Sequence, residues 1–163
     1  MMFLVIFLIS IAIGLVSAMR HADKKALFYE CFLTPVVFIG IGFTGLLGFF
    51  GHVFMADATA VKIGWPTGSP FQFEVGAHDG CWGVLALFSA WFKGGFMVAT
   101  ALGWSLFLLL AGYGHIRETV LHGNFAPYNF GCIAGDIVPA VCILVLTSLY
   151  YKHSIRLPQM TGE

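Results

Sequence analysis

Two segments of this sequence pair a carboxylate with an imidazole at helical spacing. Glu74 and His78 are four residues apart, and His115 and Glu118 are three apart. Residues at these spacings share one helix face. Carboxylate-bridged metal bundles use Glu and His from facing helices, although as Glu-x-x-His pairs, whereas here one spacing is longer and the other order is reversed. With Asp136 as a further carboxylate, the pattern predicts a metal site of Glu74, His78, His115, Glu118 and Asp136.

The histidines alone allow a second cofactor prediction. Haem in a membrane bundle takes axial imidazoles from facing helices at similar depth, which His52, His78 and His115 satisfy. Glycines recur every three residues from Gly42 to Gly51, and they would form a smooth ridge. A flat macrocycle could approach such a ridge, but close packing of another helix is the simpler interpretation.

Two other interpretations of the polar residues stay open. A salt-bridged network could tie the helices together, with Arg117 neutralising Glu118 or Asp136. A proton or solute path could use Asp136 and Glu74 as titrating groups. Few polar residues continue such a path toward the far side of the membrane; they are Ser89, Thr100 and Ser105.

Composition defines the class of protein. Of 163 residues, 59% are hydrophobic and only 10% charged, with a mean hydropathy of +0.89. Soluble domains carry about 25% charged residues, so lipid must solvate much of this surface. The formal net charge is zero, which excludes a basic field for nucleic acid. Phosphate-binding loops, nucleophile elbows and HExxH motifs are missing, so we expect that the isolated chain is not an enzyme.

Hydrophobic run lengths predict an all-α, polytopic transmembrane helix bundle in a single domain over 1–163. About five spans are expected, as a four-helix polar core plus an N-terminal helix. Their predicted ranges are 2–19, 27–55, 72–91, 96–119 and 130–151. Pro35 predicts a kink or a late start in the second span, and the Gly- and Pro-rich segment 56–71 predicts a loop.

Basic residues predict the orientation of the bundle. Six of the eight Lys and Arg residues fall at one end of it, and only Lys62 and Arg117 fall at the other. The six are Arg20, Lys24, Lys25, Lys93, Lys152 and Arg156. The positive-inside rule then places the N-terminus outside and the C-terminus in the cytoplasm. The ionisable groups of four spans, Asp79 among them, therefore gather in the outer leaflet.

Loops and cysteines add smaller predictions. Ser69 and Pro70 are typical of a helix start, which places Glu74 in a first turn where it favours the helix dipole. The segments 65–70 and 124–129 are expected to form two halves of a lid over the polar residues. The four cysteines are best explained as packed thiols, with a Cys81–Cys132 bridge as the alternative.

The run Gly-Trp-Pro-Thr-Gly-Ser-Pro-Phe-Gln-Phe-Glu-Val-Gly over 64–76 resembles a family of small bacterial and archaeal integral membrane proteins of unknown function. The segments 114–118 and 124–129 and Asp136 are similar as well, so the resemblance covers about 40–150. It implies a helical membrane fold in a bacterial or archaeal cell membrane and no particular chemistry. Characteristic positions of the family match Glu74, His115, Glu118, Asn129 and Asp136.

The leading functional hypothesis is a membrane subunit that binds a metal or haem in its outer leaflet for electron transfer or redox chemistry. One alternative is a small-solute or proton transporter. Another is a structural or assembly subunit of a larger membrane complex. The expected partners are the lipid bilayer and either other membrane subunits or further copies of this chain.

Overall fold

The computed structural model describes residues 2–156, and all its elements are helices. They are α1 (Met2–Met19), α2 (Lys25–Pro35), η1 (Val36–Ile41), α3 (Gly42–Phe54), α4 (Ala56–Ile63), α5 (Phe71–Phe88), α6 (Gly95–His122), α7 (Pro127–Tyr150) and η2 (Tyr151–Arg156). The segments η1 and η2 are π-helical. The predicted all-α class is confirmed.

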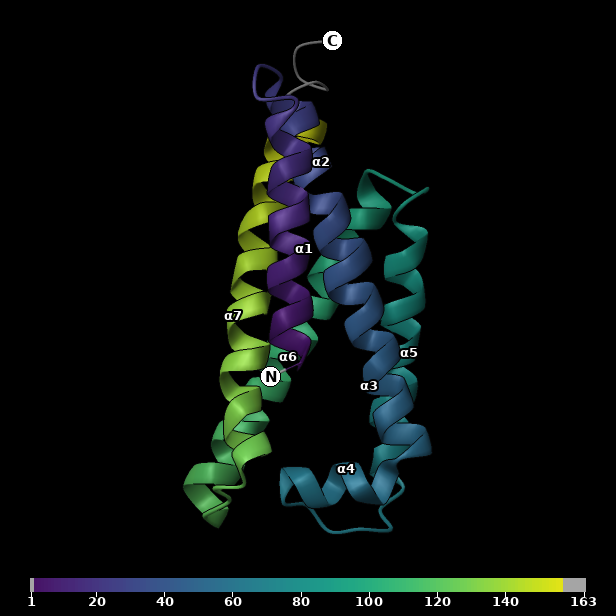
Figure 1. The fold of residues 1–163 in the computed structure, drawn as a ribbon, viewed down its shortest axis with the longest axis vertical. Helices are drawn as coiled ribbons and strands as arrows, with labels where there is room; N and C mark the ends of the chain where they lie inside the picture. Colours follow the sequence, from purple (N-terminus) through teal and green to yellow (C-terminus); the bar gives the residue numbers. More distant parts are fainter. Residues whose placement is uncertain (1, 157–163) are drawn as a thin grey trace.

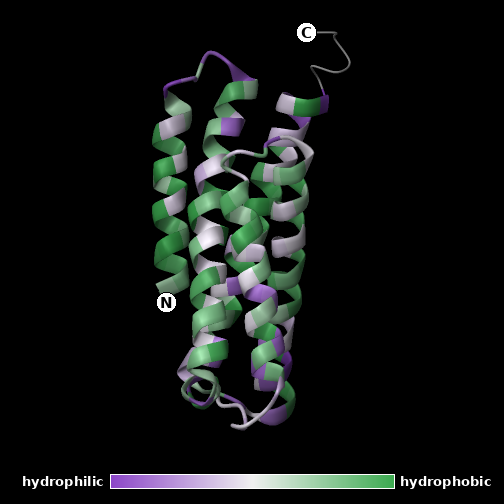
Figure 2. Cartoon of the chain, turned by 90° about the vertical axis from the view of Figure 1, so that its right-hand side faces the viewer, coloured by the Kyte–Doolittle hydropathy of each residue, from purple (hydrophilic) through white to green (hydrophobic). Residues whose placement is uncertain are grey.

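Four helical stretches are long and apolar enough to cross a membrane, namely Met2–Met19, Lys25–Phe54, Gly95–His122 and Pro127–Arg156. The remaining predicted span, 72–91, corresponds to α5, which has 18 residues but contains Gln72, Glu74, His78 and Asp79. It is not among the four, so the count of five spans is not confirmed. Hydrophobic residues cover the sides of the bundle, and hydrophilic ones are frequent at its ends (Figure 2).

The long helices form two closely packed pairs, α3 with α5 and α6 with α7 (Figure 1). Helix α1 packs against α2 and η1, and its N-terminus lies part of the way along the bundle rather than at its end (Figure 1). The short helix α4 crosses one end of the bundle, roughly perpendicular to the long helices (Figure 1). At this end α4 contacts both pairs, through α3 and α5 on one side and α7 on the other.

Glycines bring α3 and α5 into backbone contact. A Cβ atom on Gly45 would lie 2.6 Å from the Asp79 carbonyl oxygen and 2.8 Å from the Gly83 Cα. Gly42 and Gly48 are buried against the same helix. Small residues at such spacing allow close helix packing in membranes. The predicted glycine ridge is thus a helix-packing surface over its first three members.

Local structure departs from the prediction mainly in the segment 56–71. Residues 56–63 form helix α4 instead of a loop, with Asp57 in the first turn, Lys62 in the last, and Gly64 in the left-handed region (φ 81°) at the C-terminus. These are favourable helix-end residues, which the glycines and prolines farther along obscured. After Pro35 the helix continues through η1, and a π-helical segment is a usual way to absorb a proline within a span.

Helix α5 begins close to its predicted start. The Phe71 backbone N–H donates to Ser69 Oγ over 3.3 Å, and Glu74 lies in the first turn as predicted. Helix α7 begins at Pro127, three residues before its predicted start, because proline suits the first helical position. All four cysteines are free, so the alternative Cys81–Cys132 bridge is wrong.

Candidate functional site

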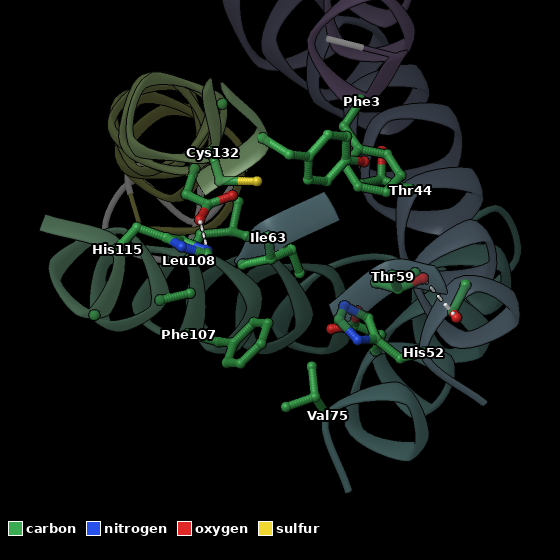
Figure 3. Close-up of a pocket in the computed structure, with 18 of the residues that line it drawn as sticks. Phe3, Thr44, His52, Thr59, Ile63, Val75, Phe107, Leu108, His115 and Cys132 are labelled. Carbon is green, nitrogen blue, oxygen red and sulfur yellow. Dashed lines mark hydrogen bonds and ion pairs between the residues drawn. The ribbon is translucent and has the colours of Figure 1, made fainter. Parts of the chain in front are cut away.

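A cavity of about 700 Å³ lies between the α3–α5 pair and the α6–α7 pair. Its lining also includes Met2 and Phe3 of α1. Thr59 and Ile63 of α4 line it as well, and Figure 3 shows Phe3, Thr59 and Ile63 around the same space. Ligand sites of small molecules typically have volumes of about 300–1,000 Å³. The cavity is therefore large enough for a small organic ligand.

Most of the cavity wall is apolar. The aromatic and aliphatic side chains include Phe3, Phe7, Phe107, Trp104, Leu108 and Ile143. Polar side chains from five helices interrupt this wall. They are Thr44, His52, Thr59, Lys62, Asp79, His115, Arg117, Glu118, Tyr128, Cys132 and Asp136. Such a wall suits a molecule with a large apolar part and a small polar one.

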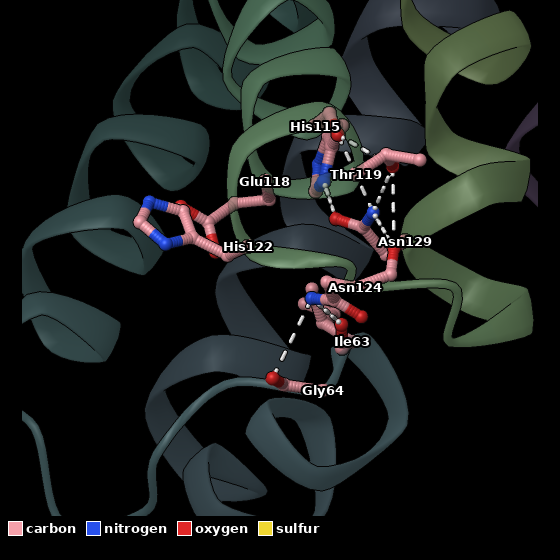
Figure 4. Close-up of polar contacts among 8 residues, drawn as sticks. All are labelled: Ile63, Gly64, His115, Glu118, Thr119, His122, Asn124 and Asn129. Atoms are coloured by element: carbon pink, nitrogen blue, oxygen red, sulfur yellow. Dashed lines mark hydrogen bonds and ion pairs between the residues drawn. The ribbon is translucent and has the colours of Figure 1, made fainter.

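His115 is oriented by a hydrogen-bond network at the corner between α6 and α7 (Figure 4). Its Nδ1 lies 2.8 Å from Asn129 Oδ1. The Asn129 amide nitrogen donates to Thr119 Oγ1 over 2.9 Å and to the Asn124 carbonyl oxygen over 3.0 Å. These acceptors define which end of the Asn129 amide is the nitrogen, so its oxygen accepts the proton on His115 Nδ1. The network thereby leaves His115 Nε2 as the ring atom available for a ligand.

The cavity side of His115 faces a carboxyl group and an indole. His115 Nε2 lies 3.8 Å from Asp136 Oδ2. The Trp65 ring stacks on the imidazole with 5.7 Å between centroids and a 10° interplanar angle. Trp65 follows α4 in the chain, so the segment that closes the cavity also covers His115.

The same corner holds α4 in place. Asn124 Nδ2 donates to the Ile63 carbonyl oxygen over 2.9 Å, and Asn124 Oδ1 accepts from the Ala126 backbone N–H over 3.1 Å (Figure 4). Thr59 Oγ1 on α4 donates to the Gly51 carbonyl oxygen over 2.8 Å. Of the two predicted lid segments, the one over 124–129 thus contacts the C-terminal end of α4.

His52 lies across the cavity from His115 (Figure 3). Its Nδ1 lies 2.7 Å from Gln72 Oε1 of α5. An amide oxygen can only accept, so His52 Nδ1 donates, and Nε2 is its remaining ring nitrogen. In both cavity histidines, Nδ1 therefore donates to a side-chain amide oxygen, which orients the ring.

Two of the predicted metal ligands lie outside the cavity. Glu74 is exposed in the first turn of α5. His78 Nε2 accepts from Trp82 Nε1 over 2.8 Å, and the His78 ring contacts Phe107 with 4.0 Å between centroids. The buried face of α5 is formed instead by Gln72, Gly76, Asp79, Gly83 and Ala86. Glu74 and His78 do share a face, as their spacing predicts, but this face is not the one that packs against α3.

The remaining predicted residues are only partly brought together. Glu118 lines the cavity, and its Oε1 lies 3.8 Å from Nε2 of His122, one helical turn further along α6. Arg117 forms no ion pair within residues 2–156, so the predicted pairing with Glu118 or Asp136 is wrong. Within the same residues, no three His, Cys, Asp or Glu side chains are close enough to hold a metal ion.

Gln72 and Trp65 are site residues that the sequence analysis missed. Gln72 and Asp79 are seven residues apart, which is two helical turns, so they share a face of α5. This spacing was a usable signal for Gln72. The position of Trp65 depends on the turn after α4. Trp65 and His115 belong to different segments, so helical spacing could not predict that their rings stack.

The fold and the cavity define the class: a polytopic, all-α protein with apolar helices suited to a membrane and an internal cavity that contains ionisable side chains. Residues 1–156 match the model of a family described as "Family of unknown function (DUF6790)", and the chain belongs to this family. No curated protein and no solved structure matches the chain.

Proposed function

We propose that this chain is an integral membrane protein that binds a small amphipathic molecule between α3–α5 and α6–α7, as a carrier or receptor within the bilayer. The observation that supports this function is the cavity itself, because about 700 Å³ of largely apolar space contains two oriented imidazoles and three carboxyl groups. A tightly packed structural bundle would fill this space with side chains, since protein interiors are close-packed.

The wall indicates how such a molecule would lie. Its polar part would contact the side chains of His52 and His115. Its apolar part would lie along Phe3 and Leu108, which line the same space. This arrangement would let a membrane-dissolved molecule retain apolar surroundings while its polar group gains hydrogen bonds that lipid does not offer.

In this proposal the chain is one integral membrane domain in which α5 also crosses the bilayer, for a total of five spans. Its packing against α3 supports this, because α5 connects the end of the bundle that contains α4 with the end where α6 begins (Figure 1). The uneven distribution of Lys and Arg supports a cytoplasmic location for the end opposite α4.

Cavity filling tests the proposed function. Gly135 lines the cavity, and a Cβ atom added there meets nothing within 4 Å, so Gly135→Leu places its side chain in the cavity without a backbone clash. Gly131 on the same helix is exposed and does not line the cavity, and a Cβ atom there also meets nothing within 4 Å. Gly131→Leu is therefore the matched control.

The measurement uses the neutral fluorophore N-phenyl-1-naphthylamine and energy transfer from the tryptophans, two of which line the cavity. Wild type and Gly131→Leu should show a saturable signal above the partition of the dye into detergent, and Gly135→Leu should lose it. Equal saturable signals from all three proteins would refute binding in this cavity.

A metal or haem is the second candidate, and one observation favours it. Both cavity histidines have Nδ1 bonded to a side-chain amide oxygen, the kind of outer contact that orients metal-ligating imidazoles. The test is an absorbance spectrum with elemental analysis of purified protein, wild type beside His115→Ala. A stoichiometric metal or Soret band that the variant loses would support the cofactor, and its absence from wild type would count against it.

A further inference from the structure

Two carboxyl groups face the cavity from opposite helix pairs, and neither is paired with a Lys or Arg among the described residues. Asp79 of α5 is only 8% exposed, and its Oδ1 has no hydrogen-bond partner among the described residues. Asp136 of α7 lies 3.8 Å from His115, which is beyond hydrogen-bond distance. The corresponding neighbour of Asp79 is His78, at 3.9 Å. Neither carboxyl group has a Lys or Arg nitrogen within 4 Å in the range 2–156.

An unpaired carboxylate in such surroundings is costly and requires a proton or a cation. Besides its two histidines, the cavity is lined by Lys62 and Arg117, which are exposed and form no ion pair with either aspartate. The cavity therefore offers two carboxyl groups that a cationic ligand could pair with, and neither is paired with a Lys or Arg among residues 2–156.

The rest of the wall indicates what kind of cation would fit. A bare inorganic ion needs a compact cage of oxygen ligands, whereas this cavity is about 700 Å³ and mostly apolar. Aromatic faces attract organic cations, and Trp104 and Phe107 both line the space. The volume of the cavity, its aromatic side chains and its carboxyl groups thus all favour an organic cation as the ligand.

We propose that the molecule bound in this cavity is an organic monocation, such as a lipophilic amine or onium ion, with its charge between Asp79 and Asp136. This proposal rests on the proposed function and specifies the chemical class of its ligand. The polar contacts of the cation come from two helix pairs, so a bound cation would draw α5 and α7 toward the same charge.

Two ions of the same shape and opposite charge test the proposal. Tetraphenylphosphonium and tetraphenylborate are each titrated against purified protein that holds N-phenyl-1-naphthylamine. The phosphonium should displace the dye at a concentration at least about tenfold lower than the borate. In an Asp79→Asn/Asp136→Asn double variant this preference should disappear, while the neutral dye still binds and thereby reports an intact cavity.

Glu74→Gln is the control, because it removes one carboxylate from α5 at an exposed position outside the cavity. It should retain the wild-type preference for the phosphonium. Dye binding with equal displacement by both ions, or an unchanged preference in the double variant, would overturn the cation proposal while the proposed binding function stands. If neither the dye nor the phosphonium binds saturably to wild type, both proposals are wrong.

Discussion

His115 Nδ1 and Asn129 Oδ1 lie 2.8 Å apart and connect α6 to the first turn of α7. Asn129 is fully buried, and its amide nitrogen is bonded within the same corner, to Thr119 and to the Asn124 backbone. Because Asn129 holds Nδ1 of the imidazole, Nε2 of His115 points toward Asp136 and the cavity. The contact is therefore both a structural link between helices and the determinant of the histidine's orientation.

Replacing Asn129 should disturb both roles. Asn129→Ala removes the acceptor for His115 and leaves Thr119 and a backbone carbonyl without their donor, so we expect a loss of about 1–3 kcal/mol in stability. Thermal unfolding followed by intrinsic fluorescence measures this loss. Ser148→Ala is the control on the same helix, because Ser148 is exposed and bonds only the Leu144 carbonyl oxygen. An unfolding temperature equal to that of Ser148→Ala would contradict the importance of the network.

Two glycines that follow α4, both with a positive φ, can test how the C-terminal end of this helix is held. Gly64 (φ 81°) and Gly68 (φ 73°) both occupy the left-handed region, so alanine is strained at either position. Only at Gly64 would a Cβ atom also lie 2.5 Å from Asn124 Oδ1; at Gly68 nothing lies within 4 Å. We expect Gly64→Ala to destabilise the protein more than Gly68→Ala, by about 1–3 kcal/mol from overpacking.

Hydrogen exchange locates the effect of these two variants. Backbone amides in 56–63 should exchange faster in Gly64→Ala than in Gly68→Ala, because the contact between Asn124 and the end of α4 is disturbed only in the first. Identical exchange of α4 in the two variants would mean that Asn124 does not hold this helix.

The glycine contact between α3 and α5 predicts a large effect of a single methyl group. In Gly45→Ala the new Cβ atom would lie within 3 Å of backbone atoms of Asp79 and Gly83, which cannot rotate away as a side chain can. The helices would have to separate, at an expected cost of about 1–3 kcal/mol. Gly131→Ala on α7 meets open space and should instead be neutral or stabilising by roughly 0.5–1 kcal/mol. Unfolding temperatures of the two variants, measured in the same detergent, compare these effects.

The proposed five-span topology predicts which connections face the cytoplasm. An alkaline phosphatase reporter, which is active only outside, should be active when fused after Gly68 and inactive when fused after Gly94, on the two sides of α5. If α5 did not cross, the connections on its two sides would face the same side. Activity of the fusion after Gly94 would therefore exclude a crossing by α5 in the proposed orientation. A fluorescent protein fused at Gly94 provides the reciprocal measurement.

Much of the fold can be predicted from the sequence because it depends on local properties of the chain. A long apolar run must cross or line a membrane whatever its neighbours are, and the four apolar helical stretches of the structure overlap four of the predicted ranges, the last extending over Pro127–Arg156 instead of 130–151. Helix-end residues such as Pro127 and Gly64 are also local signals, although the glycines and prolines after Gly64 concealed α4. Helix α5 is less apolar than the four long stretches because of its polar residues, of which Gln72 and Asp79 are buried and Glu74 is exposed.

The composition of the site depended instead on how the helices are rotated and paired. Helical spacing correctly put Glu74 and His78 on one face of α5, yet the cavity takes Asp79, the residue next to His78. Adjacent residues on a helix point about 100° apart, and the backbone contact of Gly45 with Gly83 sets which of them turns inward. Spacing alone therefore determined which side chains lie together on each helix and near which end of the bundle. Which faces meet across the cavity follows from the packing of non-local surfaces, and no window of the sequence contains that information.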